Sequence, residues 1–489
     1  GSRATALGYR ALNTQNFTTA TDNYNVAVGF QSGYSVTTGA NNTLIGSLSG
    51  DAITTGGKHT AVGYAALSSI TTGTDSCAFG YLALASSTGS QNNAFGRSTL
   101  EALTTGIHNV GIGYASMSAA TTASYNTAVG NFTLDAITTA DGNTGVGYAV
   151  LTTNTSGNAN VGMGYAALFS NSTGVNNTAI GYGSLDANTT ASNNTSMGLN
   201  TLGANTTGAQ NVAIGSQALL QNTTASNNVA VGFSAGFSIT TGTQSTFIGS
   251  LAGDALTTGN YNTALGYSAL SADTLGSRST AIGVGALLRQ NFTSATDVYN
   301  VAMGHNAGEN VTTGVENTLI GGLVADALTT SSRNTAIGYA ALSAEVQGQY
   351  NTAIGYAALL AQTNSSSTDV YNTAVGYAAG AAVTTGTLNT LVGGLTGDAL
   401  TTGADNTALG MAALGNDTKG NKAVAIGEGA LHNQNFTTST DNYNVAVGFD
   451  AGNDITTGTL NTFVGGLSGD ANTTGTANNA FGYDALGAN

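Results

Sequence analysis

The sequence predicts an all-β protein built as a parallel β-solenoid (β-roll), and three observations support this fold class. The stretch NTAIGYAALSA, Asn334 to Ala344, returns as NTAIGYAALLA, Asn351 to Ala361. Aligned on the glycine of its AIG or AVG step, here called the marker glycine, the motif occurs 28 times, and 22 of the 27 intervals are 17 residues long. Proline is absent from all 489 residues, where about 5% is usual, which indicates a backbone that needs almost every N–H group. A short fixed period sustained along a chain is typical of a solenoid.

Each repeat predicts one coil. The consensus N-T-A-[IV]-G-Y-x-A-L-x-x-x-T-T-G-x-x contains an alternating β-branched run, a second short run and polar turn residues, so its apolar period is two and favours strands. We expect two short strands and two turns per coil, about 28 coils, and a single continuous repeat domain over residues 1–489. Gly1 and Ser2 resemble a cloning remnant, and both chain ends fall inside the repeat pattern, which suggests an excerpt of a longer fibre.

The first strand shows which side faces the interior. The residue before the marker glycine is always apolar and the residue two positions earlier is nearly always Thr or Val, so both lie on one side of the strand. The residue between them is usually Ala and lies on the other side. Where it is large, as at Leu44 or Phe247, the usual Leu four residues after the marker glycine becomes Gly50 or Gly253. This exchange of volume predicts that the Ala and Leu positions fill the interior.

The Ile/Val and Thr/Val side should therefore face outward as an apolar ridge. A single chain would then expose more contiguous apolar surface than soluble proteins usually do, so we expect another copy of the chain to cover it. The predicted interface residues are Ile45, Val62, Val129, Ile180, Ile214, Ile282, Ile337, Ile354, Val375, Ile426 and Val464.

Composition excludes several classes of partner. The net charge is -15 and only nine residues are Lys or Arg, too few for the basic patches that bind nucleic acid. No run of about 18 apolar residues occurs, so no membrane insertion is expected in this segment. The one cysteine, Cys77, stands where other repeats carry Thr or Val and is expected to be a structural thiol.

Catalytic and metal-binding patterns are not found. The histidines occupy different repeat positions without a carboxylate or cysteine at ligand spacing: His59, His108, His305 and His432. The recurring acids lie on separate coils, which argues against a cation site within one chain: Asp51, Asp254, Asp326, Asp398 and Asp470. No nucleophile and base can be paired, so we expect no enzymatic activity, no cofactor and no metal.

Four intervals of 21 residues each insert four residues, and insertions in a solenoid form loops on one face, often the binding face. One interpretation is a row of ligand-binding loops. The other is duplication of a 72-residue block that carries a loop without function. The candidate binding residues are Phe17, Asp22 and Tyr24, then Phe292, Asp297 and Tyr299, then Asp369 and Tyr371, then Phe436, Asp441 and Tyr443.

Tyrosine often follows the marker glycine, as at Tyr64, Tyr114 and Tyr165, and predicts an aromatic ladder along one edge. Such a ladder could stack on sugars, but the interpretation we favour is structural. The Asn before each strand, such as Asn126 or Asn334, is expected to satisfy turn amides in a ladder of its own.

The motif N-[TV]-A-[IV]-G resembles the head repeat of YadA-type trimeric autotransporter adhesins, and the longer coil, as in NTAIGYAAL, looks like repeats of bacteriophage tail fibres. The resemblance covers essentially the whole chain. It implies a left-handed parallel β-roll, three chains around a threefold axis, and an adhesive or host-recognition role. The 17-residue coil is longer than the autotransporter repeat, and no neck, stalk or anchor is visible in these residues.

These expectations favour a homotrimeric, non-enzymatic fibre shaft on a virion or a bacterial surface, with a cell-surface glycan or host receptor as partner. An ice-binding solenoid is an alternative, because rows of Thr at strand spacing can match an ice lattice, although the paired Thr of ITTG and LTTG lie in turns. A self-assembling extracellular filament is another, since uncovered strand edges invite stacking.

Overall fold

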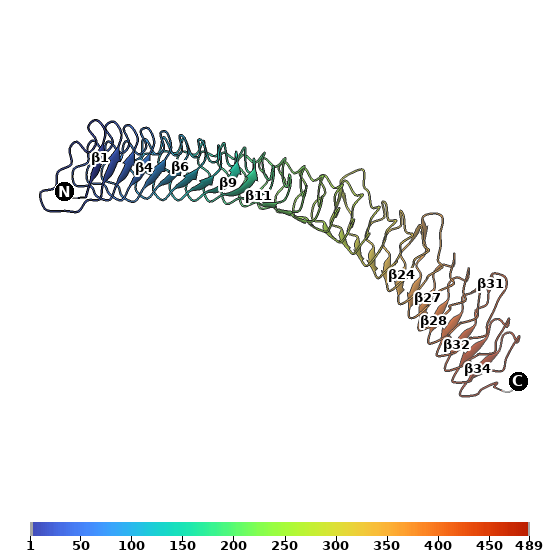
Figure 1. Ribbon diagram of the computed structural model, residues 1–489. Helices are drawn as coiled ribbons and strands as arrows, with labels where there is room; N and C mark the ends of the chain where they lie inside the picture. Colours follow the sequence, from blue (N-terminus) through green and yellow to red (C-terminus); the bar gives the residue numbers. More distant parts are fainter. Residues whose placement is uncertain (1–2, 488–489) are drawn as a thin grey trace. The chain divides into compact units, whose positions relative to one another are not determined.

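A computed structural model describes residues 3–487, and all regular structure in this range is β-strand, with no helix. The chain falls into two compact units, Gly1–Thr241 and Gly242–Asn489. In each unit, short strands lie side by side in chain order, one to a coil (Figure 1). The predicted parallel β-solenoid of about 28 coils is confirmed. Gly1 and Ser2, the suggested cloning remnant, lie outside the described residues.

Within residues 3–241, the described part of the first unit, there are fourteen strands. They are β1 (Thr5–Leu7), β2 (Val26–Val28), β3 (Thr43–Ile45), β4 (Thr60–Val62), β5 (Cys77–Phe79), β6 (Asn93–Phe95), β7 (Val110–Ile112), β8 (Thr127–Val129), β9 (Thr144–Tyr148), β10 (Val161–Tyr165), β11 (Thr178–Ile180), β12 (Thr195–Met197), β13 (Val212–Ile214) and β14 (Val229–Val231).

The second unit repeats this pattern and adds three pairs of two-residue strands. Its strands are β15 (Thr246–Ile248), β16 (Thr263–Leu265), β17 (Gly276–Ser277), β18 (Thr280–Ile282), β19 (Thr296–Asp297), β20 (Val301–Met303), β21 (Thr318–Ile320), β22 (Thr335–Ile337), β23 (Gly348–Gln349), β24 (Thr352–Ile354), β25 (Thr368–Asp369), β26 (Thr373–Val375), β27 (Thr390–Val392), β28 (Thr407–Leu409), β29 (Gly420–Asn421), β30 (Val424–Ile426), β31 (Thr440–Asp441), β32 (Val445–Val447), β33 (Thr462–Val464) and β34 (Asn479–Phe481).

Neighbouring strands are parallel and in register, so equivalent residues of successive coils lie next to one another. In the pair β3 and β4, Leu44 lies beside Ala61 and Ile45 beside Val62. The middle residue of these strands is fully buried, whereas the first and third are half-exposed or exposed. The predicted assignment of faces is therefore confirmed, with the Ala row inside and the Ile/Val row outside.

The second run of the consensus, which was predicted to be a strand, is a turn. Within residues 3–487, only the coils that carry β17, β19, β23, β25, β29 and β31 have a second strand, formed by other residues. In the coil of Gly63, Ala65 and Leu67 have φ values of 51° and 56°, in the left-handed region rather than the β region. Their N–H groups still donate to adjacent coils, Ala65 to Ser47 O at 3.0 Å and Leu67 to Ala83 O at 3.0 Å. The second run is thus a hydrogen-bonded turn that brings Leu67 into the core, where it is fully buried.

The marker glycine is required by the close approach of consecutive coils. Gly46 has a φ of +133°, and a Cβ atom on it would collide with the carbonyl group of Gly63 in the following coil. A side chain here would meet both the steric clash and an unfavourable backbone conformation. This explains why the glycine recurs in every coil.

The exchange of volume inferred from the sequence is seen in the core, and it extends over two coils. A Cβ atom on Gly50 would lie 2.7 Å from a methyl carbon of Leu44, and a Cβ atom on Gly33 in the preceding coil would lie 2.8 Å from the other methyl carbon. Phe463 is enclosed in the same way by Gly452 and Gly469. Leu44 and Phe463 are therefore each flanked by two glycines, one in the same coil and one in the preceding coil, and the sequence pattern had indicated only the one in the same coil.

The Asn before each strand forms a buried ladder. Asn126 donates its backbone N–H to Asn109 Oδ1 at 3.0 Å and its side-chain amide to Ala140 O at 2.9 Å. The predicted ladder is therefore present, since each side-chain oxygen accepts from a backbone amide of the next coil, and each side-chain NH2 group also donates to a turn carbonyl, which was not predicted. In one coil the ladder position is His59, which lies 2.7 Å from Gly73 O through Nε2 and accepts from Ser76 N through Nδ1 at 3.3 Å.

His59 should make the first unit sensitive to mild acid. Burial lowers the pKa of this imidazole, although its contacts with Gly73 and Ser76 act in the opposite direction. The folded chain holds the neutral ring while the unfolded chain takes up a proton near pH 6.5, so stability is complete above that pH and is lost as the pH falls below it. We expect His59→Asn to remove this loss. The melting temperatures of both proteins between about pH 8 and pH 5 test this expectation. It would be contradicted if the melting temperatures of the two proteins changed with pH in the same way.

Candidate functional site

The inserted loops, residues 13–25, 289–300, 361–372 and 433–444, are the first candidate surface. In the second unit each loop adds a short parallel strand pair to the coil before it, β17 with β19, β23 with β25, and β29 with β31. The strand β31 lies on such a loop in Figure 1.

In the second and fourth loops, two predicted binding residues of each loop contact a cation of the preceding coil. Arg278 forms a 2.9 Å ion pair with Asp297 and lies over the ring of Tyr299 at 5.6 Å from its centroid. Lys422 makes the same two contacts, with Asp441 at 2.6 Å and with Tyr443 at 5.2 Å. Hydrogen bonding to Lys422 lowers the pKa of Asp441.

The other two loops vary this arrangement. In the first, Arg3 pairs with Asp22 at 3.3 Å and lies over Tyr24. In the third, Tyr350 takes the place of the cation and stacks on Tyr371 at 4.9 Å. The four loop tyrosines remain about half exposed, which leaves part of each ring open to a partner: Tyr24, Tyr299, Tyr371 and Tyr443. Asp369 is also exposed.

The loop phenylalanines are placed differently from the tyrosines. Phe292 and Phe436 are each only 6% exposed and belong to the core, while Phe17 is half-buried. Their side chains can thus hold the loops but offer little surface to a ligand. The third loop carries Asn364 at this position, and it is also buried.

Beneath each loop of the second unit lies a buried acid, and sequence reasoning missed all three. Asp273, Glu345 and Asp417 have no exposed surface. Asp417 accepts hydrogen bonds from the N–H groups of Gly420 at 2.9 Å and Phe436 at 3.2 Å, and from Gln434 Nε2 at 2.6 Å. The acid therefore joins the loop backbone to the coil before it.

The other two acids are held in the same way. Asp273 accepts from Gln290 Nε2 at 2.6 Å, and burial raises its pKa, although these hydrogen bonds act to lower it. Glu345 accepts from Gln362 Nε2 and from the Asn364 side chain, both at 2.8 Å. Glu345, whose side chain is longer than that of Asp, thus occurs with the loop in which Asn364 replaces the Phe of the other two loops. The sequence signal was an acid that precedes each loop glutamine by 17 residues.

A buried amide in the last loop is a further cost to stability. Among the described residues, the Asn442 Nδ2 group has no hydrogen-bond partner, whereas the equivalent residue of the third loop is the buried Val370. We expect Asn442→Val to change the stability of the loop by less than about 1 kcal/mol, because it removes the unsatisfied amide but also takes away the Oδ1 that accepts from the buried Asn444 N at 2.9 Å. Val370→Asn is the matched control and should destabilise its loop. Thermal unfolding measures both, and a change of more than about 1 kcal/mol in Asn442→Val would refute the expectation.

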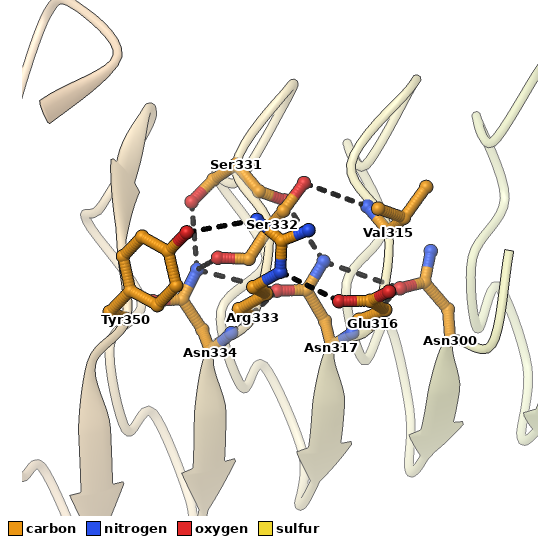
Figure 2. Close-up of polar contacts among 9 residues, drawn as sticks. All are labelled: Asn300, Val315, Glu316, Asn317, Ser331, Ser332, Arg333, Asn334 and Tyr350. Carbon is orange, nitrogen blue, oxygen red and sulfur yellow. Dashed lines mark hydrogen bonds and ion pairs between the residues drawn. The ribbon is translucent and has the colours of Figure 1, made fainter. Parts of the chain in front are cut away.

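A second candidate surface is the row of residues that directly precede the ladder position, here called the pre-asparagine row. It holds five of the nine basic residues, Arg3, Lys58, Arg278, Arg333 and Lys422. Figure 2 shows Arg333 between two members of the row, donating to Glu316 at 2.7 Å and to the Tyr350 hydroxyl at 2.9 Å. Exposed ion pairs of this kind stabilise a fold only slightly.

Beside this row lies the outward sheet face, made of the first and third residues of each three-residue strand. Ile45 is 39% exposed, and the other predicted interface residues are half-exposed. Larger side chains at the third position are more open, such as Phe79 at 49% and Met163 at 44%. All the predicted interface residues therefore face outward and keep apolar surface in contact with water.

The predicted tyrosine ladder is present at the C-terminal end of the strands, directly after the marker glycines. Tyr148, Tyr165 and Tyr182 stack with centroid separations of 5.3 and 5.0 Å and interplanar angles of 12° and 9°. Because neighbouring rings cover one another's faces, a sugar ring could reach only ring edges within the ladder. This arrangement agrees with the structural interpretation of the ladder rather than with sugar stacking.

The recurring acids do not converge. Asp254 accepts a hydrogen bond from Ser271 at 2.6 Å and Asp326 accepts one from Ser343 at 2.5 Å, each from the next coil. Burial raises the pKa of Asp51, Asp254 and Asp398. Within residues 3–487, no three His, Cys, Asp or Glu side chains are grouped so that they could hold a metal ion.

Comparison with known proteins adds no assignment. No protein-family model matches the chain, and no curated protein matches it. In the described part of the chain, no helix is long and apolar enough to cross a membrane.

Proposed function

We propose that this chain is a segment of a non-enzymatic extracellular fibre, in which three copies pack through their outward sheet faces. The proposal rests on this face, where a row of apolar residues such as Val129 and Ile180 runs beside a row composed mostly of Thr and stays half-exposed along successive coils. Soluble monomers rarely keep contiguous apolar patches larger than a few hundred Å². Three chains follow from the resemblance to YadA-type head repeats and phage tail fibres, whose family we propose for this chain.

The proposed fibre is adhesive, on a virion or a bacterial surface, and recognises a cell-surface glycan or host receptor. Support comes from the contrast between an invariant scaffold and variable exposed residues. The loop tyrosines and the pre-asparagine row offer aromatic and charged groups at fixed positions, and functional residues often lie on loops held by a rigid scaffold.

Binding of the fluorescently labelled protein to a glycan array and to whole bacterial cells tests the adhesive role. Tyr299→Ala combined with Tyr443→Ala removes two half-exposed loop rings and should weaken binding at least about tenfold, since stacked or buried aromatic anchors dominate recognition. Tyr267→Ala is the matched control, because this ring is 56% exposed and lies outside the loops. Equal binding by all three proteins would argue against the loops as the binding surface.

An ice-binding role receives less support. The first Thr of many turn pairs uses its hydroxyl within the chain, as Thr54 Oγ1 donates to Thr71 O at 3.1 Å and Thr121 Oγ1 to Thr138 O at 3.0 Å. These hydroxyl groups are therefore engaged along the coil edge rather than set out as a flat array. We expect no thermal hysteresis, and substantial activity in that assay would reverse this ranking.

A further inference from the structure

The stacked tyrosines have a chemical consequence that is independent of the proposed function. In the first unit Tyr148, Tyr165 and Tyr182 come from consecutive coils and are 46%, 49% and 57% exposed. The strand register places Tyr148 directly beside Tyr165. In the second unit Tyr339 and Tyr356 stack at 5.7 Å, and Tyr356 and Tyr377 at 5.4 Å. Each triple thus holds phenol rings in contact while their edges remain open to solvent.

Few other side chains compete for a one-electron oxidant. Tryptophan is absent, and the single thiol, Cys77, is only partly exposed. Burial raises the pKa of Cys77, so its reactive thiolate form is disfavoured. Exposed methionines such as Met163 react by gaining an oxygen atom, which is a different, two-electron oxidation. Exposed tyrosine is therefore the principal site of radical chemistry on this chain.

We propose that the two tyrosine triples are sites of oxidative cross-linking, in which rings of adjacent coils couple to dityrosine. The co-reactants are hydrogen peroxide and a haem peroxidase. Each of two phenols loses one electron and one proton, and the two radicals join through their ortho carbons. Both ortho C–H bonds are replaced by one C–C bond, the rings regain their phenol O–H groups, and the two electrons and two protons reduce one hydrogen peroxide to two waters.

Proximity directs this coupling within the chain. A ring whose partner is held about 5 Å away meets it far more often than it meets a ring of another molecule, because the ordering is already complete in the fold. The product would join one coil to the next by a covalent bond across neighbouring strands, in addition to the backbone hydrogen bonds between them. Coils joined in this way should separate at a higher temperature.

The test treats the full chain with a haem peroxidase and hydrogen peroxide, then maps cross-linked peptides by mass spectrometry and measures dityrosine fluorescence. Wild-type protein should give links from Tyr165 to Tyr148 and to Tyr182, with a yield per molecule that does not depend on protein concentration. Tyr165→Phe keeps a stacking ring but should lose both links, while the Tyr339, Tyr356 and Tyr377 triple still reacts. Tyr267→Phe is the control and should leave the yield unchanged.

Three outcomes would overturn the proposal. They are an absence of dityrosine in the treated wild-type protein, links to Tyr267 as frequent as links to Tyr165, and a yield that rises with protein concentration. Circular dichroism of the untreated variants shows whether the β-structure is retained. If Tyr165→Phe failed to fold, Tyr356→Phe would provide the same comparison in the second unit, where it should abolish that triple's links alone.

Discussion

Asp417→Asn is expected to cost about 3 kcal/mol of local stability, because it removes an acceptor from a buried, hydrogen-bonded group. The new amide would turn a donor toward Gln434 Nε2, which now donates to the acid at 2.6 Å. Gln434 cannot relieve this by rotating its amide, since its Oε1 accepts from Asn444 at 2.8 Å. Asn444 is fixed in turn by its contacts with Gly458 and Asn461. The conflict therefore stays buried under the loop.

Native-state hydrogen exchange measures this effect where it occurs, because opening of one loop need not unfold the whole solenoid. The amides of Gly420 and Phe436, which both donate to Asp417, should exchange about a hundredfold faster in the variant. Asp417→Asn combined with Gln434→Glu is the matched control. It reverses the donor and acceptor between the two side chains, keeps an oxygen for both amides, and should restore most of the protection. Unchanged exchange in the single variant would show that the buried acid does not hold the loop.

Gly50→Leu is expected to destabilise the first unit by about 2 kcal/mol through overpacking. The backbone is not the obstacle, because Leu67 occupies the equivalent position of the next coil with a φ of 56°, the same as that of Gly50. The obstacle is Leu44, whose methyl carbon would lie 2.7 Å from the new Cβ atom.

The double variant Gly50→Leu with Leu44→Ala recreates the usual coil and should recover more than about 1 kcal/mol relative to the sum of the single changes. Leu44→Ala alone leaves a cavity and should be destabilising by itself. Thermal unfolding of the wild type, the two single variants and the double variant gives the coupling free energy between positions 44 and 50. Additive effects would mean that the two positions do not share the same space.

The sequence allowed the faces of the coil to be predicted because strand periodicity and volume exchange act on neighbouring positions. Ile45 outward and Leu44 inward follow from a period of two, and Gly50 follows from the size of Leu44. The turn containing Leu67 could not be predicted as such. A leucine in the left-handed region is uncommon, and only the contacts of two adjacent coils maintain it.

The loops were located correctly by their spacing, but the roles of their residues depend on contacts across coils. From the sequence, Phe436 was predicted to be a binding residue on an exposed loop. In the structure it is buried beneath the loop. Asp417 looks like one of many turn acids, and only the fold brings Gln434 and the loop amides to it. Asp441 and Tyr443 were predicted to be binding residues. In the structure Asp441 forms an ion pair with Lys422, and the Lys422 ammonium lies over the ring of Tyr443. Binding by these loops stays a prediction.

The solution mass of the chain, measured by light scattering coupled to size exclusion, shows how many copies associate. The chain mass is 48.2 kDa, and packing of three outward sheet faces predicts a particle of three times that mass. Replacing Val129 and Ile180 with Lys should shift the protein toward lower mass, because both residues lie on that face. A stable wild-type particle of 48.2 kDa would contradict the account, since the apolar row would then face solvent without a partner.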